Sequence, residues 1–139
     1  MVFAPCDFDT PYYLLHANEL HNNVRSLQRA MSTYWGNFII GYSLKTNPLP
    51  WLLMLFKEYG FYAEVVSEDE YNLSSQIGYA PHKVIYNGPY KSKKTFLEAI
   101  HNKCIVNIDS QRELEWLKEA NDSYSAGDAI EVGIRVNFD

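Results

Sequence analysis

The chain has 139 residues, of which 47% are hydrophobic and 21% charged, a balance typical of a globular domain and unlike that of a disordered or fibrous chain. The formal net charge is -5 and the basic residues are scattered, which argues against a nucleic-acid partner. No apolar run approaches the roughly 20 residues of a membrane-spanning helix, and the N-terminus lacks a secretory-signal pattern. We therefore expect a cytoplasmic protein without a membrane partner, in which Cys6 and Cys104 are free thiols.

The first third of the chain predicts a helix, a strand and a second helix. Apolar residues recur at steps of three and four between residues 18 and 34, which indicates one face of an amphipathic helix. A strand-like run over residues 38–44 ends at Lys45. Pro50 then suits the first turn of a helix over residues 51–59.

The strand-then-helix unit repeats along the rest of the chain. Further strands are predicted by apolar runs at residues 62–66, 84–86, 105–108 and 130–136. Capping boxes of the form Ser-x-x-Glu at 67–70 and 110–113, and a capping serine at position 92, mark the helix starts. Because a parallel return needs a helical crossover, this alternation predicts an α/β fold with a parallel sheet.

Two architectures fit this alternation of elements. A doubly wound open sheet of five strands would be a complete, flavodoxin-like module. A TIM barrel needs eight strands and roughly 250 residues. The number of strands alone therefore favours the open sheet.

In both architectures ligands bind at the carboxyl ends of the strands, so the residues that close each strand are candidate site residues. They include Lys45, Glu64, Asn87, Asp109 and Arg135. A nucleophilic amine must be neutral, and burial of Lys45 beside Arg135 would favour that form. On residue type alone, the alternatives are a solvated lysine at Lys45 and structural ion pairs at Glu64 and Arg135.

Other kinds of site find little support in the sequence. The four histidines show no ligand spacing with one another or with the cysteines, so we expect no metal site. No glycine-rich nucleotide-binding sequence and no nucleophile elbow occurs after any predicted strand.

Five short blocks follow the predicted strands in order. They read YSLKTN at 42–47, EVVSEDE at 64–70, IYNGPYKS at 85–92, NIDSQREL at 107–114 and GIRVN at 133–137. This set resembles the conserved blocks of fold-type III pyridoxal phosphate (PLP) enzymes, the family of the ornithine, diaminopimelate and arginine decarboxylases and of alanine racemase. One departure is Glu64, which stands where the family commonly has Asp.

The resemblance implies a TIM barrel of the alanine racemase-like type and so overrides the strand count. Residues 1–139 would supply about five of its eight βα units, as the N-terminal portion of a PLP-binding barrel domain. The remaining barrel strands and the C-terminal β domain would be absent from this chain. The resemblance also implies that Lys45 forms the Schiff base with PLP and that Glu64 and Arg135 contact the cofactor.

The implied activity is decarboxylation of an amino-acid substrate by the full-length enzyme, which would be a homodimer of the diaminopimelate or ornithine decarboxylase kind. The 139 residues by themselves would be inactive. One alternative is a PLP-dependent racemase, in which the same lysine transfers a proton at the α-carbon. Another is a truncated, catalytically silent homologue that binds a partner.

Overall fold

The computed structural model describes residue 9 and the ranges 11–123 and 129–136, and it divides the chain into two units, Met1–Phe38 and Ile39–Asp139. The first unit contains one long helix, α1 (Ala17–Tyr34), which confirms the amphipathic helix predicted there. Within the described ranges, no helix is long and apolar enough to cross a membrane. Cys6 and Asn137, which entered the sequence predictions, lie outside these ranges.

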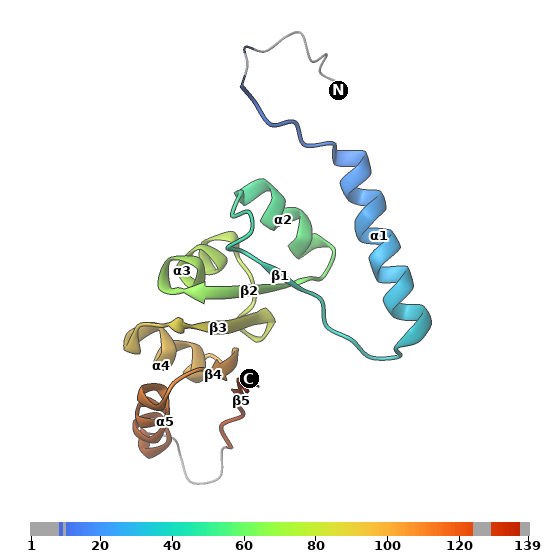
Figure 1. Ribbon diagram of the computed structural model, residues 1–139. Helices are drawn as coiled ribbons and strands as arrows, with labels where there is room; N and C mark the ends of the chain where they lie inside the picture. The colour runs from blue at the N-terminus through green and yellow to red at the C-terminus, as the bar shows by residue number, and fades with distance from the viewer. Residues whose placement is uncertain (1–8, 10, 124–128, 137–139) are drawn as a thin grey trace. The chain divides into compact units, whose positions relative to one another are not determined.

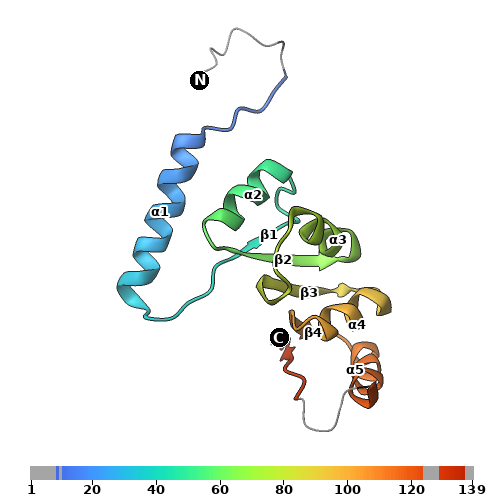
Figure 2. The ribbon, with the colours of Figure 1, turned by 180° about the vertical axis from the view of Figure 1, so that it is seen from behind.

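The second unit is a five-stranded parallel sheet with the strands in the order β1-β2-β3-β4-β5 (Figures 1 and 2). Each of the first four strands is followed by a helix, as the alternation in the sequence predicted. The elements are β1 (Gly41–Ser43), α2 (Pro50–Glu58), β2 (Tyr62–Ser67), α3 (Glu68–Ile77), the 3-10 helix η2 (Pro81–Lys83), β3 (Val84–Tyr90), α4 (Lys93–His101), β4 (Ile105–Ile108), α5 (Gln111–Ser123) and β5 (Gly133–Ile134).

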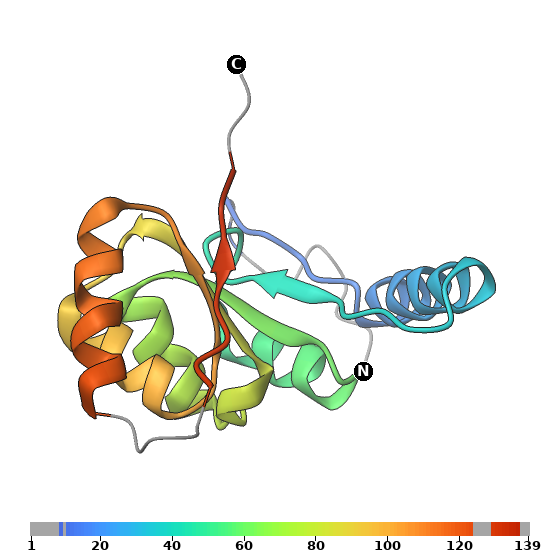
Figure 3. The same ribbon diagram turned by 90° about the horizontal axis from the view of Figure 1, so that it is seen from below.

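The sequential strand order distinguishes between the two architectures. A doubly wound sheet reverses its strand order at a central switch point and carries helices on both faces. Here the order never reverses, and helices α2 to α5 lie together on one side of the sheet (Figure 3). The open sheet favoured by the strand count is therefore wrong. The predicted barrel fold is confirmed as an unclosed segment of five parallel strands.

The hydrophobic core lies between the sheet and these helices. Val65, Tyr86 and Val106, from three neighbouring strands, are completely buried on this face. Phe96 of α4 packs in the same cluster, and the rings of Tyr71 and Tyr86 stack with centroids 5.3 Å apart. Burying a large apolar side chain contributes about 1.5–3 kcal/mol, so this face supplies most of the stability of the unit.

The capping box predicted at the start of α3 is formed in both directions. Ser67 Oγ accepts a hydrogen bond from the backbone N–H of Glu70 at 3.3 Å, and Glu70 Oε2 accepts one from the N–H of Val66 at 2.9 Å. The helix ends at Gly78, whose φ of 83° is the left-handed conformation that glycine adopts readily. The direction in which the chain leaves β2 is therefore fixed by local sequence.

The second predicted capping box is only half formed. Glu113 Oε2 accepts from the backbone N–H of Asp109 at 2.9 Å, but Ser110 Oγ is buried without a hydrogen-bond partner. The N–H of Glu113 donates instead to the backbone oxygen of Ser110 at 3.2 Å. The box prediction was therefore wrong for the serine.

The outer strands are shorter than predicted. The run over residues 38–44 forms a strand only at Gly41–Ser43, and the run over 130–136 only at Gly133–Ile134. Each of these strands has a neighbour on one side alone, so fewer of its backbone groups are paired.

Candidate active site

Lys45 lies in a tight turn directly after β1. The N–H of Leu44 donates to the backbone oxygen of Glu64 on β2 at 2.9 Å, and the N–H of Thr46 closes the turn onto Ser43 at 3.1 Å. Leu44 is completely buried, whereas Lys45 is exposed. The turn is thus anchored on both sides of an exposed lysine, and the expected burial of Lys45 was wrong.

Tyr42 supports this turn from inside the unit. Its ring stacks on Phe56 of α2 with centroids 4.1 Å apart, and its hydroxyl donates to the backbone oxygen of Asn47 at 3.2 Å. Burial raises the pKa of the Tyr42 hydroxyl above its ordinary value of 10.0. The hydroxyl therefore keeps its proton at neutral pH and remains a donor to the loop that follows Lys45.

A row of polar side chains crosses the sheet on the face opposite the helices. Glu64 Oε1 accepts a hydrogen bond from Asn87 Nδ2 at 2.9 Å, and Asn87 Oδ1 accepts from Asn107 Nδ2. These three residues, which we call the amide row, come from β2, β3 and β4. Because Asn87 donates through its nitrogen on one side and accepts through its oxygen on the other, the row fixes the orientation of the Glu64 carboxylate.

The amide row continues to the last strand through a close packing contact. A Cβ atom at Gly133 would lie 1.8 Å from Asn107 Oδ1, so no larger residue fits there without moving Asn107. The glycine of the last block therefore has a steric reason: it leaves room for the end of the amide row.

Four charged side chains form a second group at the carboxyl ends of β3, β4 and β5. Lys91 Nζ donates to Asp109 Oδ2 at 2.9 Å, to Glu113 Oε2 at 3.2 Å and to the backbone oxygen of Gly88 at 2.6 Å. Arg135 Nη1 contacts the other oxygen of Asp109 at 3.2 Å. We call Lys91, Asp109, Glu113 and Arg135 the charged cluster; its two cations balance its two carboxylates.

Arg135 differs from the other members because its side chain is 55% exposed. The expectation that it lies beside Lys45 was wrong. Lys45 follows β1 and Arg135 follows β5, and three strands lie between them in the sheet. Both nevertheless stand at the same, carboxyl edge of the parallel sheet.

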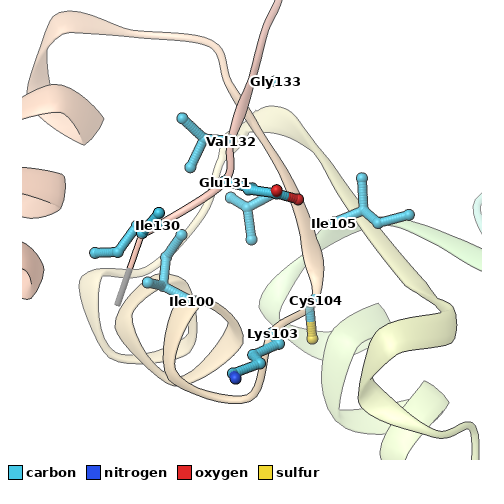
Figure 4. Close-up of a pocket in the computed structure, with 10 residues that line it drawn as sticks. Ile100, Lys103, Cys104, Ile105, Ile130, Glu131, Val132 and Gly133 are labelled. Carbon is cyan, nitrogen blue, oxygen red and sulfur yellow. The ribbon is translucent and has the colours of Figure 1, made fainter. Parts of the chain in front are cut away.

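A pocket among the described residues lies away from both groups (Figure 4). It has a volume of about 500 Å³ and is bounded by the end of α4, the start of β4 and the segment leading into β5. Its walls are mostly apolar, and Lys103 and Glu131 provide its charged groups. Because it lies at the amino ends of the strands, it is not the candidate site.

The thiol in this region is not a candidate nucleophile. Cys104 is free and buried, and burial raises the pKa of its thiol to about 11. It therefore stays protonated at neutral pH. Among the described residues, no group of three or more potential metal ligands was found.

Sequence reasoning correctly placed Asp109 directly after β4, but it expected Asn87 to follow a strand that ends at residue 86, whereas Asn87 lies within β3. It also missed Lys91 and interpreted Glu113 as a helix cap alone. The signal for Lys91 was present, because it lies inside the block at 85–92. Its burial could not be inferred, since lysines are mostly exposed.

Parallel strands in sequential order, with helices on one side, define a segment of a (βα)-barrel, a fold in which sites lie at the carboxyl edge of the strands. Residues 19–139 match the family model described as pyridoxal-dependent decarboxylase, pyridoxal binding domain. The chain belongs to this family, whose cofactor is pyridoxal phosphate.

Individual relatives agree with this assignment. The chain is 29% identical over 133 residues to diaminopimelate decarboxylase of Aquifex aeolicus, covering 95% of this chain and 30% of the relative. It is 32% identical over 130 residues to the probable chloroplastic diaminopimelate decarboxylase of Oryza sativa, covering 94% of this chain and 26% of the relative. The chain thus spans about a third or less of the curated relatives it matches.

Solved structures show the same fold. The crystal structure of diaminopimelate decarboxylase from Helicobacter pylori complexed with L-lysine matches 95% of this chain with a TM-score of 0.77 at 23% identity, and the match covers 33% of that structure. A structure from Aquifex aeolicus matches 84% of this chain with a TM-score of 0.69 at 29% identity, covering 28% of that structure.

Proposed function

We propose that this chain forms the attachment segment of a PLP-dependent amino-acid decarboxylase of the diaminopimelate decarboxylase kind. The observation that carries the proposal is the position of Lys45 in an anchored turn at the carboxyl edge of a family-typical sheet. Its amine would be the group that holds the aldehyde carbon of the cofactor. The complete enzyme would be a cytoplasmic homodimer, and the 139 residues by themselves would be inactive.

The residues present fit such a cofactor in part. Ser43 Oγ, two residues before Lys45, is buried without a hydrogen-bond partner in the described structure. A buried hydroxyl of this kind calls for a partner that the described residues do not supply, and a polar ligand would be one. The Arg135 guanidinium is half exposed at the same edge and would provide positive charge toward an anionic group of the cofactor.

Glu64 would act by position and charge. The amide row holds its carboxylate at a fixed angle on the face opposite the helices. A fixed carboxylate can keep a proton or a positive charge at one place on a neighbouring ring. We assign Glu64 and Arg135 to cofactor binding and Lys45 to both binding and catalysis.

The cofactor, when bound, withdraws electrons from the α-carbon of an amino acid so that the α-carboxylate can leave. The protein's part is to orient the reacting bond and to exclude water. Curated relatives act on diaminopimelate, and a solved relative was crystallised with L-lysine. We therefore propose a diamino acid as the substrate class.

Substitution of the attachment lysine tests the assignment. In the complete protein, Lys45→Ala should abolish the visible absorbance that a lysine-bound cofactor produces, and carbon dioxide release should stop. Lys94→Ala is the matched control, because Lys94 is an exposed lysine on α4 and should leave both signals unchanged.

Two results would contradict the proposal. If Lys45→Ala retained the absorbance, another lysine would hold the cofactor. If the unmodified protein exchanged the α-proton of its substrate without releasing carbon dioxide, it would be a racemase.

A further inference from the structure

Lys91 is a buried lysine that is linked through Asp109 to Arg135, one of the residues that we assign to cofactor binding. Lys91 itself has no role in the function proposed so far. Its side chain is 0% exposed, so a ligand at the carboxyl edge cannot touch it. An ammonium group has three N–H donors, and Lys91 has an acceptor for each: Gly88, Asp109 and Glu113. Any effect of Lys91 on the site must therefore pass through these neighbours.

Asp109 is the neighbour that connects Lys91 to the site. Its Oδ2 is held by Lys91 at 2.9 Å, and its Oδ1 contacts Arg135 Nη1 at 3.2 Å. Because a carboxylate is planar and rigid, fixing one oxygen also fixes the direction in which the other points. We propose that Lys91 is a positioning residue that sets the location of the Arg135 guanidinium through Asp109. The functional part of this inference rests on the proposed role of Arg135 at the cofactor.

The backbone strengthens the connection. The N–H of Arg135 donates to the backbone oxygen of Ile108 at 3.0 Å, which places the start of the arginine side chain next to Asp109. The guanidinium has five N–H donors, and the contact with Asp109 engages one of them. The side chain is thus held at one corner while the remaining donors can face a ligand.

Charge balance explains why Lys91 is needed for this arrangement. Asp109 and Glu113 are two buried carboxylates whose combined charge is balanced by Lys91 and Arg135. Without Lys91, both carboxylates would depend on one half-exposed arginine. Buried carboxylates without a partner are strongly unfavourable, so the guanidinium would be drawn toward them and away from the edge.

The experiment compares two lysines at neighbouring positions. Lys91→Met removes the buried cation, and Lys93→Met is the matched control, because Lys93 pairs with Glu119 at 2.6 Å on the exposed surface. The reporter is the Nε–Hε resonance of Arg135 in the NMR spectrum of the cofactor-free chain. We expect it to shift in Lys91→Met and to stay in place in Lys93→Met. An unchanged resonance in a folded Lys91→Met variant would overturn the proposal.

Two further variants keep the test decisive if Lys91→Met does not fold. Lys91→Met combined with Glu113→Gln restores the charge balance but leaves Asp109 Oδ2 without the ammonium that holds it, so we expect it to fold with Arg135 still displaced. In the reciprocal variant, Arg135→Met removes a half-exposed side chain, and we expect the chain to stay folded because Lys91 still contacts both carboxylates. It should shift the ammonium resonance of Lys91, and an unchanged Lys91 signal there would overturn the proposal.

A titration of the complete protein with pyridoxal 5′-phosphate tests whether the contacts from Lys91 through Asp109 to Arg135 affect cofactor binding. We expect Lys91→Met, or the charge-balanced double variant, to bind it about tenfold more weakly, and Lys93→Met to bind it normally. Equal affinity in a folded Lys91 variant would overturn the role at the cofactor. If the unmodified complete protein failed to bind the cofactor while the resonances still shifted, the proposed function would fail and the positional coupling would stand.

Discussion

The two faces of the sheet in the second unit are built from alternate residues of the same strands, yet they differ in chemistry. On the face toward the helices, Val65, Tyr86 and Val106 are completely buried. On the opposite face, their sequence neighbours Glu64, Asn87 and Asn107 form the amide row and are only partly buried. One face therefore supplies stability, and the other supplies oriented polar groups.

This difference between the faces explains how the sheet can carry a row of partly buried polar side chains and remain stable. A row of amides and a carboxylate is costly to bury unless every group is paired, and here each member hydrogen-bonds to the next. The rigid apolar face holds β2, β3 and β4 at fixed spacing. The amide row can then keep its geometry without contributing much to stability itself.

The largest expected effect is on the apolar face. Phe96→Ala removes a completely buried ring, and we expect it to lower the free energy of unfolding by about 3–5 kcal/mol. Tyr90→Ala is the aromatic control, because Tyr90 is 84% exposed and should change stability by less than about 0.5 kcal/mol. Urea unfolding of the chain measures both, and similar losses for the two variants would contradict the comparison of faces.

A smaller effect is expected where the amide row meets the last strand. Gly133→Ala places a Cβ on Asn107 Oδ1 and should cost about 1–3 kcal/mol by overpacking. Combining it with Asn107→Ala removes the clashing atom and should restore part of the loss. Gly36→Ala is the control, because a Cβ there would meet nothing within 4 Å. If the double variant were no more stable than Gly133→Ala, steric conflict with Asn107 would not be the cause.

The smallest effect is the pH dependence that comes from the buried thiol. In the unfolded chain the Cys104 thiol loses its proton above its ordinary pKa of 9.0, whereas in the folded chain burial raises that pKa to about 11. The contribution of the protonated thiol to the free energy of unfolding is thus fully present below pH 9 and is lost as the pH rises toward 11. Unfolding free energies at pH 8 and pH 10 should fall less for Cys104→Ala than for the unmodified chain. An equal fall in the unfolding free energy of the two proteins would show that Cys104 contributes nothing to the pH dependence.

Much of the fold was predictable because its signals are local. The capping box at Ser67 and the capping serine at position 92 depend on residues three positions away, and both form as predicted. Strand positions followed from short apolar runs, although the outer strands are shorter because they have partners on one side alone. The choice between barrel and open sheet was not local: the strand count gave the wrong answer, and only the resemblance gave the right one.

The candidate site was less predictable, because its contacts join residues far apart in the chain. The carboxyl-edge rule located Lys45 and Arg135 at one edge, but Glu64 lies within β2 and not at its end. The rule also could not give the exposure of Lys45. Nor could it give the contact between Lys91 and Asp109, which depends on the register of two strands. The cofactor roles of the three residues are predictions, and Lys45→Ala tests the first of them directly.

The sequential strand order also bears on how the chain folds during synthesis. Ala63 of β2 pairs with Val84 of β3, and Ile85 of β3 pairs with Ile105 of β4, so each strand finds its neighbour in the segment made just before it. Contacts of moderate sequence separation form faster than distant ones. Each new strand and helix can therefore dock on an edge that already exists while the ribosome is still extending the chain.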